Sequence, residues 1–328
     1  MTLPGFVDLQ VNGYLNIDFS SDSLTTASFM EACNALFEAG TAAFLPTIIT
    51  SPAGLYERNL AIIADVMKRD AYRGRVLGVH LEGPFISKEP GAVGAHNPAY
   101  VIKPDTAMLS RWQTISGGAV KLITIAAEAE GSEAFTRFAV ANGVAVSLGH
   151  QLATYADMKR LAAAGARAST HVGNGVPNML PRHENPIWAA AACDGLSAML
   201  ITDGHHLPPQ VITTIVRAKC ILGTIITSDA SPLAGMPPGE YQTLGNRAVL
   251  EPGGRLHNPD KQCLVGSSAV MLACANHLNT LSIVSPKDIV TMGLHNPLAL
   301  IGMRTSDIAP HKHIRVTYRN GAFAVVKK

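Results

Sequence analysis

The chain has 328 residues, of which 47% are hydrophobic and 15% are charged, so it can fill a substantial buried core. Its formal net charge is +2 and it has no cluster of lysines and arginines, which argues against a nucleic-acid or membrane-surface binder and favours a small-molecule substrate. The five cysteines include no C-x-x-C pair, and no stretch resembles a signal peptide or a membrane-spanning helix, so we expect a reducing cytoplasm.

Short apolar runs alternate with longer segments of helical periodicity, which is typical of a parallel α/β sheet. Two of the longer segments, 28–40 and 154–166, have helical spacing and place glycines at Gly40 and Gly165, where helices commonly end. Eight runs are predicted to be strands: 5–11, 41–49, 76–83, 120–128, 144–150, 166–172, 196–204 and 223–230. Eight strands in about 230 residues predict a closed (β/α)8 barrel. A doubly wound open sheet is the alternative, but no G-x-G-x-x-G motif follows the first strand.

The pattern changes after residue 230. A loop rich in glycine and proline is followed by a polar, hairpin-like stretch with turn signals at Pro252-Gly253 and Pro259-Asp260. Two helices and a short terminal hairpin then complete the chain. We therefore divide it into a barrel of residues 1–305 and a C-terminal hairpin of residues 306–328.

Polar side chains lie at or just beyond the ends of the predicted strands. They are Gln10, Asn12, Glu82, His150, His171, Asp203, His205, His206 and Asp229. Because barrel active sites are assembled from the carboxyl ends of several strands, these residues are expected to face one site and favour the barrel over the open sheet.

Two histidines and a carboxylate on separate strand ends match a catalytic zinc site, which uses about three protein ligands and leaves a position open. The candidates are Glu82, His150 and His171. His80 shares the strand face of Glu82 one layer deeper, and we interpret it as a core histidine. Asp229 is the candidate for proton transfer, although a residue of this kind can also cap the following loop.

Eight short motifs occur together in one order: "PGFVDLQVNG", "GVHLEGPF", "GAHNP", "SLGH", "STHVGNG", "TDGHH", "TSDA" and "LVGSS". In order and spacing they resemble the N-acetylglucosamine-6-phosphate deacetylases of the amidohydrolase superfamily, over roughly residues 4 to 310. The resemblance implies a metal-dependent barrel hydrolase that removes acetate from an N-acetylated amino-sugar phosphate.

Residue roles follow from this resemblance by position. Glu82, His150 and His171 correspond to ligands of one divalent metal, expected to be zinc. Asp229 corresponds to the general base and acid, and His96 to the residue that polarises the acetamide carbonyl. The substrate-binding positions are Ala95, Asn174, Gly175, Arg182, His206, Leu264, Val265 and Gly266. In the family the arginine comes from a neighbouring subunit, so the resemblance also implies a homodimer with Arg182 contributed in trans.

The chain departs from the family in three places. The loop after the second ligand histidine is "VGNGVPNM" instead of "LFNAM", which leaves open which N-acetylhexosamine phosphate is preferred. Members of the family usually carry a longer stretch before "PGF", and the closing strand here is "IRVTYRNGAFAVV". We therefore expect the small β-sandwich domain of the family to be reduced or absent.

Two other functions remain open from the sequence. One is an amidohydrolase that acts on a different N-acyl or cyclic amide, and the other is a catalytically silent sugar-phosphate binding protein. Asp229 argues against a pure binder, which has no use for an acid–base group.

Gln10 and Asn12 occupy positions where many amidohydrolases carry a His-x-His pair that helps to hold a second metal. Neutral amides bind zinc poorly compared with imidazole. We expect the pair to form the floor of the active site and the site to hold a single metal.

Overall fold

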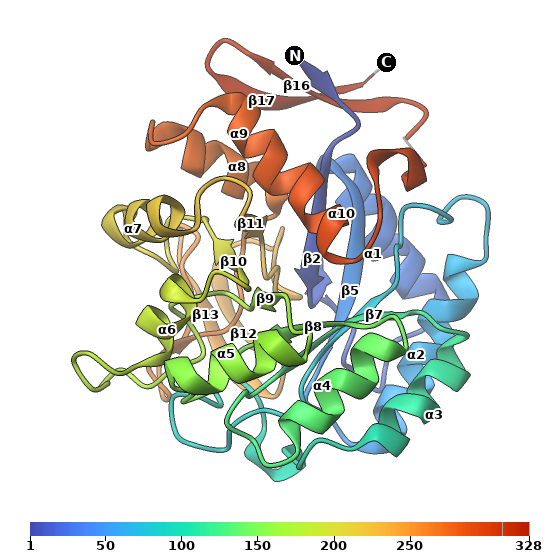
Figure 1. The fold of residues 1–328 in the computed structure, drawn as a ribbon. Helices are drawn as coiled ribbons and strands as arrows, with labels where there is room; N and C mark the ends of the chain where they lie inside the picture. The colour runs from blue at the N-terminus through green and yellow to red at the C-terminus, as the bar shows by residue number, and fades with distance from the viewer. Residues whose placement is uncertain (310, 328) are drawn as a thin grey trace.

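A parallel β-sheet forms the centre of the molecule, whose computed structural model describes residues 1–309 and 311–327 (Figure 1). Within this part of the chain, eight strands follow one another in the order β11-β10-β9-β8-β7-β6-β5-β2. Their bounds are β2 (Phe6–Val11), β5 (Thr41–Ile49), β6 (Val79–Glu82), β7 (Val120–Ile125), β8 (Ala145–Leu148), β9 (Ala168–Ser169), β10 (Ser197–Ile201) and β11 (Thr224–Thr227). Each strand falls within a run predicted from the sequence, and the (β/α)8 prediction is confirmed.

The sheet closes where the first strand meets the last. Val11 and Ala230 form a parallel bridge, and the backbone N–H of Asn12 donates to the carbonyl of Ala230 at 2.7 Å. One layer deeper, the buried carboxylate of Asp8 accepts hydrogen bonds from Thr227 Oγ1 at 2.9 Å and from the backbone N–H of Ser228 at 3.1 Å. This seam brings the ends of β2 and β11 to the same face of the barrel.

Helices pack around the barrel. The α5 helix begins and ends where the sequence predicts, and α1 lies two residues earlier than the predicted segment 28–40. Thr154 and Asp157 form a reciprocal capping box before α5, and Gly165 ends that helix in the left-handed region at φ 119°. The helices are α1 (Thr26–Glu38), α2 (Ala53–Met67), α3 (Thr106–Ser116), α4 (Ser132–Ala141), α5 (Tyr155–Ala164), α6 (Pro186–Ala192), α7 (Pro209–Lys219), α8 (Met271–Thr280), α9 (Pro286–Val290) and α10 (Asn296–Leu300), with short turns at η1 (Pro98–Tyr100), η2 (Thr291–His295) and η3 (Thr305–Asp307). Within the described residues, no helix is long and apolar enough to cross a membrane.

Aromatic packing anchors the loop that follows β6. Phe85 is fully buried and lies against Trp112, with ring centroids 5.9 Å apart, and against Phe135 at 4.9 Å. Trp112 in turn packs on Tyr56 at 4.7 Å. Because Phe85 lies three residues after Glu82, these contacts fix the backbone immediately beyond that carboxylate.

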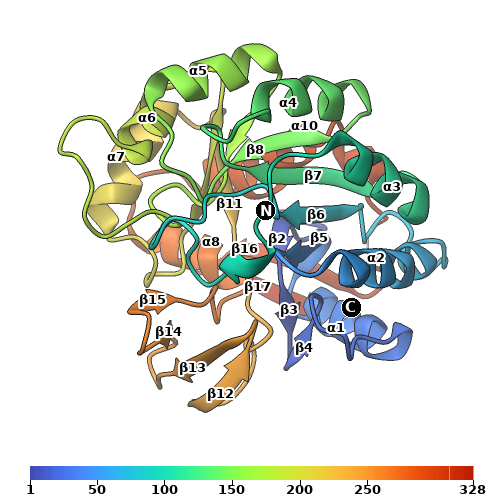
Figure 2. The same cartoon turned by 90° about the horizontal axis from the view of Figure 1, so that it is seen from below.

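A four-stranded antiparallel sheet lies beside the barrel (Figure 2). It contains β12 (Gly239–Thr243), β13 (Asn246–Leu250), β14 (Leu256–Asn258) and β15 (Cys263–Leu264), and we call residues 239–264 the insertion sheet. It corresponds to the polar, hairpin-like stretch predicted from the sequence. A second small pair, β3 (Gly13–Tyr14) and β4 (Ile17–Asp18), follows β2.

The chain ends lie together at one end of the molecule (Figure 1). The terminal hairpin of β16 (Ile314–Arg319) and β17 (Ala322–Lys327) is joined by β1 (Thr2–Leu3), which pairs antiparallel with β16. Phe323 of this sheet packs edge-on against Phe6 of β2 at 5.3 Å. The small domain is therefore present as a reduced, three-stranded sheet, and the participation of β1 is a feature that the sequence did not predict.

Candidate active site

Glu82, His150 and His171 converge at the carboxyl end of the barrel. Glu82 is the last residue of β6, and the two histidines follow β8 and β9 by two residues each. Glu82 Oε1 lies 2.9 Å from His171 Nε2 and 3.3 Å from His150 Nε2, and the two ring nitrogens are 3.1 Å apart. All three side chains are buried, and one ligand atom from each lies within 4.8 Å of the others.

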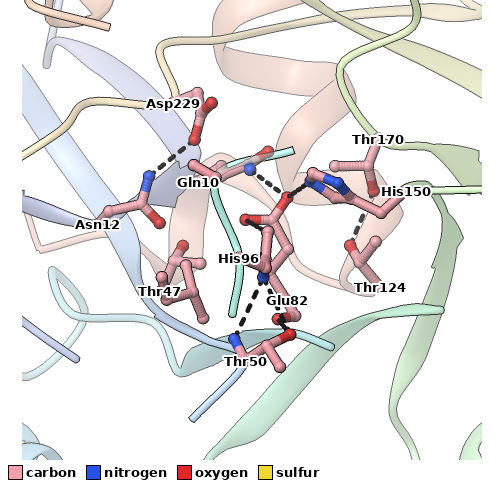
Figure 3. A network of polar contacts seen from close by, with 12 residues as sticks. Gln10, Asn12, Thr47, Thr50, Glu82, His96, Thr124, His150, Thr170 and Asp229 are labelled. Carbon is pink, nitrogen blue, oxygen red and sulfur yellow. Dashed lines mark hydrogen bonds and ion pairs between the residues drawn. The ribbon is translucent and has the colours of Figure 1, made fainter. Parts of the chain in front are cut away.

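The donor set fits a divalent metal such as zinc. His150 Nδ1 donates to the carbonyl of Ala92 at 2.8 Å, so its proton is on Nδ1 and the lone pair of Nε2 points toward Glu82 and His171. Gln10 Nε2 donates to Glu82 Oε1 at 2.7 Å, which orients the carboxylate (Figure 3). Two imidazoles and one carboxylate on rigid strand ends are the ligand types that catalytic zinc sites use.

Both histidines of the cluster have unusual backbones. His150 has φ 51° and His171 has φ 30°, in the left-handed region that residues with side chains seldom adopt. Gly175 approaches them so closely that a Cβ there would lie 2.9 Å from His150 Nδ1 and 3.0 Å from His171 Cε1. Glycine is therefore required at position 175, where its backbone lies directly against the rings of His150 and His171.

Burial and neighbouring groups shift the pKa values of the cluster. Burial opposes ionisation of Glu82, but its contacts with His150, His171 and His96 hold the pKa of this carboxyl well below its usual range. Burial opposes protonation of His171, but the contact with Glu82 raises the pKa of this imidazole. Burial and the nearby His96 lower the pKa of His150 to about 4. A carboxylate beside a neutral imidazole is the protonation state in which both groups can ligate a cation.

Asp229 approaches the cluster from the seam of the barrel. It follows β11 by two residues with φ 52°, and its carboxylate accepts a hydrogen bond from Asn12 Nδ2 at 2.7 Å (Figure 3). Burial, with a further contribution from the negative charge of Glu82, raises the pKa of Asp229 to about 7. Gln10 Oε1 and Asn12 Oδ1, both buried, have no hydrogen-bond partner within the described residues.

The hydrogen bonds of His96 define which of its nitrogens carries the proton. The backbone N–H of Thr50 donates to His96 Nδ1 at 3.3 Å, so Nδ1 is an acceptor and the proton resides on Nε2. Nε2 lies 3.6 Å from Glu82 Oε2, on the side of the metal cluster. Gly83 allows Thr50 to lie here, because a Cβ at position 83 would lie 2.2 Å from Thr50 Oγ1. His96 therefore presents an N–H donor to the site.

His206 is held by a carboxylate. Its Nδ1 lies 2.8 Å from Asp203 Oδ2, the same oxygen that accepts from Ser267 Oγ at 2.6 Å. Burial opposes ionisation of Asp203, but the contact with His206 lowers the pKa of this carboxyl below its usual range. His206 is thereby fixed in orientation at the edge of the cavity described next.

One cavity of about 340 Å³ collects most of the residues predicted from the sequence. Its lining includes Asn12, Glu82, Ala95, His96, His150, His171, Asn174, Gly175, His206, Asp229, Leu264 and Gly266. Two of the predicted substrate-binding residues do not line it: Val265 is buried with its side chain outside the cavity, and Arg182 lies on an exposed loop. Asp203 and His205, also expected to face the site, do not line it. Gln10 lies beneath the cavity and contacts it through Glu82.

Sequence reasoning missed two residues of this region. Thr50, which sets the tautomer of His96, directly follows β5 and had the same signal as the other polar residues at strand ends. Lys261 lines the cavity from the turn between β14 and β15, and no pattern in the polar insertion indicated that this turn would face the site. His80 was predicted correctly as a core residue, because its Nε2 contacts Thr124 Oγ1 at 2.8 Å inside the barrel.

Comparison with known proteins places the chain among sugar-phosphate deacetylases. No family model matches it. It is 30% identical to the N-acetylglucosamine-6-phosphate deacetylase of Lysinibacillus sphaericus over 295 residues, which cover 90% of this chain and 74% of that protein. It is 31% identical to the deacetylase of the same name from Bos taurus, over 97% of this chain and 82% of that protein. The crystal structure of the Mycobacterium smegmatis N-acetyl-D-glucosamine-6-phosphate deacetylase has the same fold, with a TM-score of 0.87 at 24% identity over 100% of this chain and 86% of the other.

Proposed function

The chain belongs to the N-acetylglucosamine-6-phosphate deacetylase family, and we propose that it hydrolyses N-acetylglucosamine-6-phosphate to glucosamine-6-phosphate and acetate. The proposal rests on one observation: three features line the same cavity. They are the cluster of Glu82, His150 and His171, the buried carboxylate of Asp229 and the N–H donor of His96. Amide hydrolysis needs these three elements: activation of water, transfer of its proton and stabilisation of an oxyanion.

Each residue has a distinct task in the reaction. Glu82, His150 and His171 would hold a divalent ion, which would supply Lewis-acid polarisation and lower the pKa of the attacking water. Asp229 takes the proton of that water and passes it to the departing amine, since a carboxyl buried near the cluster can act in both directions. The Nε2–H group of His96 donates to the acetamide oxygen as negative charge develops there.

We further propose zinc as the metal and one ion per site. Gln10 and Asn12 stand where a second site would need imidazoles, and both amide nitrogens are already committed as donors, to Glu82 at 2.7 Å and to Asp229 at 2.7 Å. Metal analysis of the purified protein should return one equivalent per chain. Two tightly bound equivalents would contradict this assignment.

Further residues of the cavity suit the sugar and its phosphate. The Asn174-Gly175 turn offers hydrogen-bond donors, and the imidazole of His206, held by Asp203, lines the same cavity. We propose that Arg182 joins them from a second subunit, because in its own chain it lies on an exposed loop and does not line the cavity.

The surface around that loop supports a homodimer. Met179 is 89% exposed, Trp188 51% and Tyr155 45%, and Trp188 and Tyr155 line one surface groove together with His183. Exposed apolar side chains gathered on one face are a mark of an interface.

The five cysteines form no disulfide, which supports a reducing compartment such as the cytoplasm.

The proposal is tested by measuring acetate release from the metal-analysed protein. N-acetylglucosamine-6-phosphate is compared with its galacto and manno isomers, because the loop 172–178 differs from the family, and with unphosphorylated N-acetylglucosamine. We expect release that depends on the metal and on the phosphate. A protein that holds its metal but releases no acetate from any of these compounds would refute the proposal and leave a sugar-phosphate binding protein.

A further inference from the structure

We propose that Lys261 is a phosphate-binding residue of the active site, supplied by the same chain as the metal ligands. The inference deepens the proposed function and rests on it for the identity of the substrate. Lys261 lies on the turn between β14 and β15 of the insertion sheet, four residues before Val265 and outside the barrel that carries the catalytic groups. Even so, it lines the same cavity as Glu82 and Asp229.

The charges of the cavity call for such a residue. A phosphate monoester carries about −1.5 to −2 charges at neutral pH. The carboxylates of Glu82 and Asp229 line the same cavity and would offset the charge of the divalent ion held there, so little positive charge is left for a dianionic phosphate. Among the described residues that line the cavity, Lys261 is the one lysine or arginine. It therefore supplies the permanent positive charge that the substrate's phosphate needs.

The backbone of the turn is fixed by side chains. Asn258 Oδ1 accepts from the backbone N–H of Asp260 at 2.9 Å and from that of Lys261 at 3.0 Å. Asn258 Nδ2 donates to Asn246 Oδ1 at 3.2 Å, and Asn246 Nδ2 donates to the carbonyl of Ala95 at 2.9 Å. Two buried asparagines thus connect the turn that carries Lys261 to the loop that carries His96.

The ammonium group is available to a ligand. Within the part of the chain that the structure describes, Lys261 has no ion-pair partner, and the adjacent Asp260 lies 3.7 Å from Arg247, which also contacts Glu240 at 3.1 Å. The neighbouring acid is thus occupied by another cation. Because the turn is anchored and the side chain is free, the ammonium group of this lysine can reach the phosphate. It binds as a point charge and does not need the fixed, planar geometry of an arginine guanidinium.

The test compares Lys261→Met with Arg255→Met, a control that removes the same charge from the same insertion sheet outside the cavity. We expect Lys261→Met to raise KM for N-acetylglucosamine-6-phosphate roughly 10- to 100-fold with little change in kcat, as for the loss of a charge-assisted hydrogen bond. Lys261→Arg should restore most of the affinity, because it restores the positive charge. Arg255→Met should behave as the wild type.

A binding measurement separates this inference from the proposed function. Calorimetric titration with glucosamine-6-phosphate needs no turnover, and Lys261→Met should weaken binding by the same factor while binding of unphosphorylated glucosamine is unaffected. If the wild type binds the sugar phosphate without deacetylating its precursor, the proposed function fails and the role of Lys261 stands. Wild-type KM and wild-type affinity in Lys261→Met, or no binding of glucosamine-6-phosphate to the wild type, would overturn the inference.

Discussion

Asp229 is the residue on which proton transfer depends, and its surroundings allow a test that leaves the site's shape intact. Asn12 donates to one carboxylate oxygen, and an asparagine at position 229 can accept the same bond through its amide oxygen. Asp229→Asn should therefore keep the metal but lose the base, and turnover should fall by about 10²- to 10⁴-fold. Acetate release and metal content, measured on the same preparation, check this. Undiminished turnover would remove Asp229 from the mechanism.

At the scale of single residues, the sequence predicted those functional groups whose position follows from strand periodicity. Glu82, His150 and His171 were found because a polar residue at the end of an apolar strand is conspicuous, and the fold brings the three together. No local pattern indicated Lys261, because its place in the cavity depends on how the insertion sheet docks on the barrel. Docking of this kind is a tertiary property without a local pattern.

At the scale of elements, the strands were located correctly but most were predicted to run too long. The prediction for β8 extended to His150 and that for β9 past His171, whereas these strands end at Leu148 and Ser169. The apolar pattern continues beyond each strand, but the ligand histidines themselves have positive φ, which is incompatible with a strand. The strand ends predicted incorrectly for β8 and β9 therefore lie at the active site, where the backbone conformation positions functional side chains.

The seam between β2 and β11 is an element whose stability should depend on pH. Desolvation by burial raises the pKa of Asp8 from its ordinary 3.8 to about 6, although hydrogen bonds from Ser228 and Thr227 lower it in part. The native state therefore holds this proton through a range in which the unfolded chain has already lost it. As the pH rises from about 4 to about 6, the contribution of Asp8 to the free energy of unfolding should fall by about 2 kcal/mol.

The variant Asp8→Asn isolates that contribution, because an amide can accept the same backbone N–H bond from Ser228 but does not titrate. Urea unfolding of both proteins at pH 4 and pH 6.5 gives the two differences in free energy. We expect the wild type to lose more stability between these values than Asp8→Asn does. Equal losses would show that Asp8 binds protons equally in the folded and unfolded states and that burial does not raise its pKa.

At the scale of the whole molecule, the proposed boundary at residue 306 separates the terminal sheet from the barrel. This small sheet has no core of its own and packs against the barrel. Phe323 is 2% exposed and contacts Phe6 of the barrel, and β1 at the other end of the chain completes the sheet. An isolated hairpin is marginally stable in water. We therefore propose that residues 306–328 fold only together with the barrel.

Phe323→Ala tests this dependence. Truncation of a buried phenylalanine costs about 3–5 kcal/mol, and if the sheet and the barrel unfold together the loss should appear in a single transition of the whole protein. Phe323→Leu, which retains most of the apolar volume, is the matched control and should be less destabilised. A separate early transition for the terminal sheet, with the barrel unchanged, would instead mark residues 306–328 as an independent unit.

The dimer proposal makes a prediction that depends on which subunit supplies each residue. If Arg182 acts in trans, a homodimer of Arg182→Met and a homodimer of Asp229→Asn each lack a complete site. A mixed dimer of the two variants has one complete site, because the subunit with an intact Asp229 receives Arg182 from its partner. Random reassortment of equal amounts should then restore about one quarter of the wild-type activity. Coexpression of the two variants and assay of acetate release measure this recovery. A mixture of Asp229→Asn with the double variant is the control and should stay inactive, and the absence of recovery in the test mixture would place Arg182 outside the partner's site.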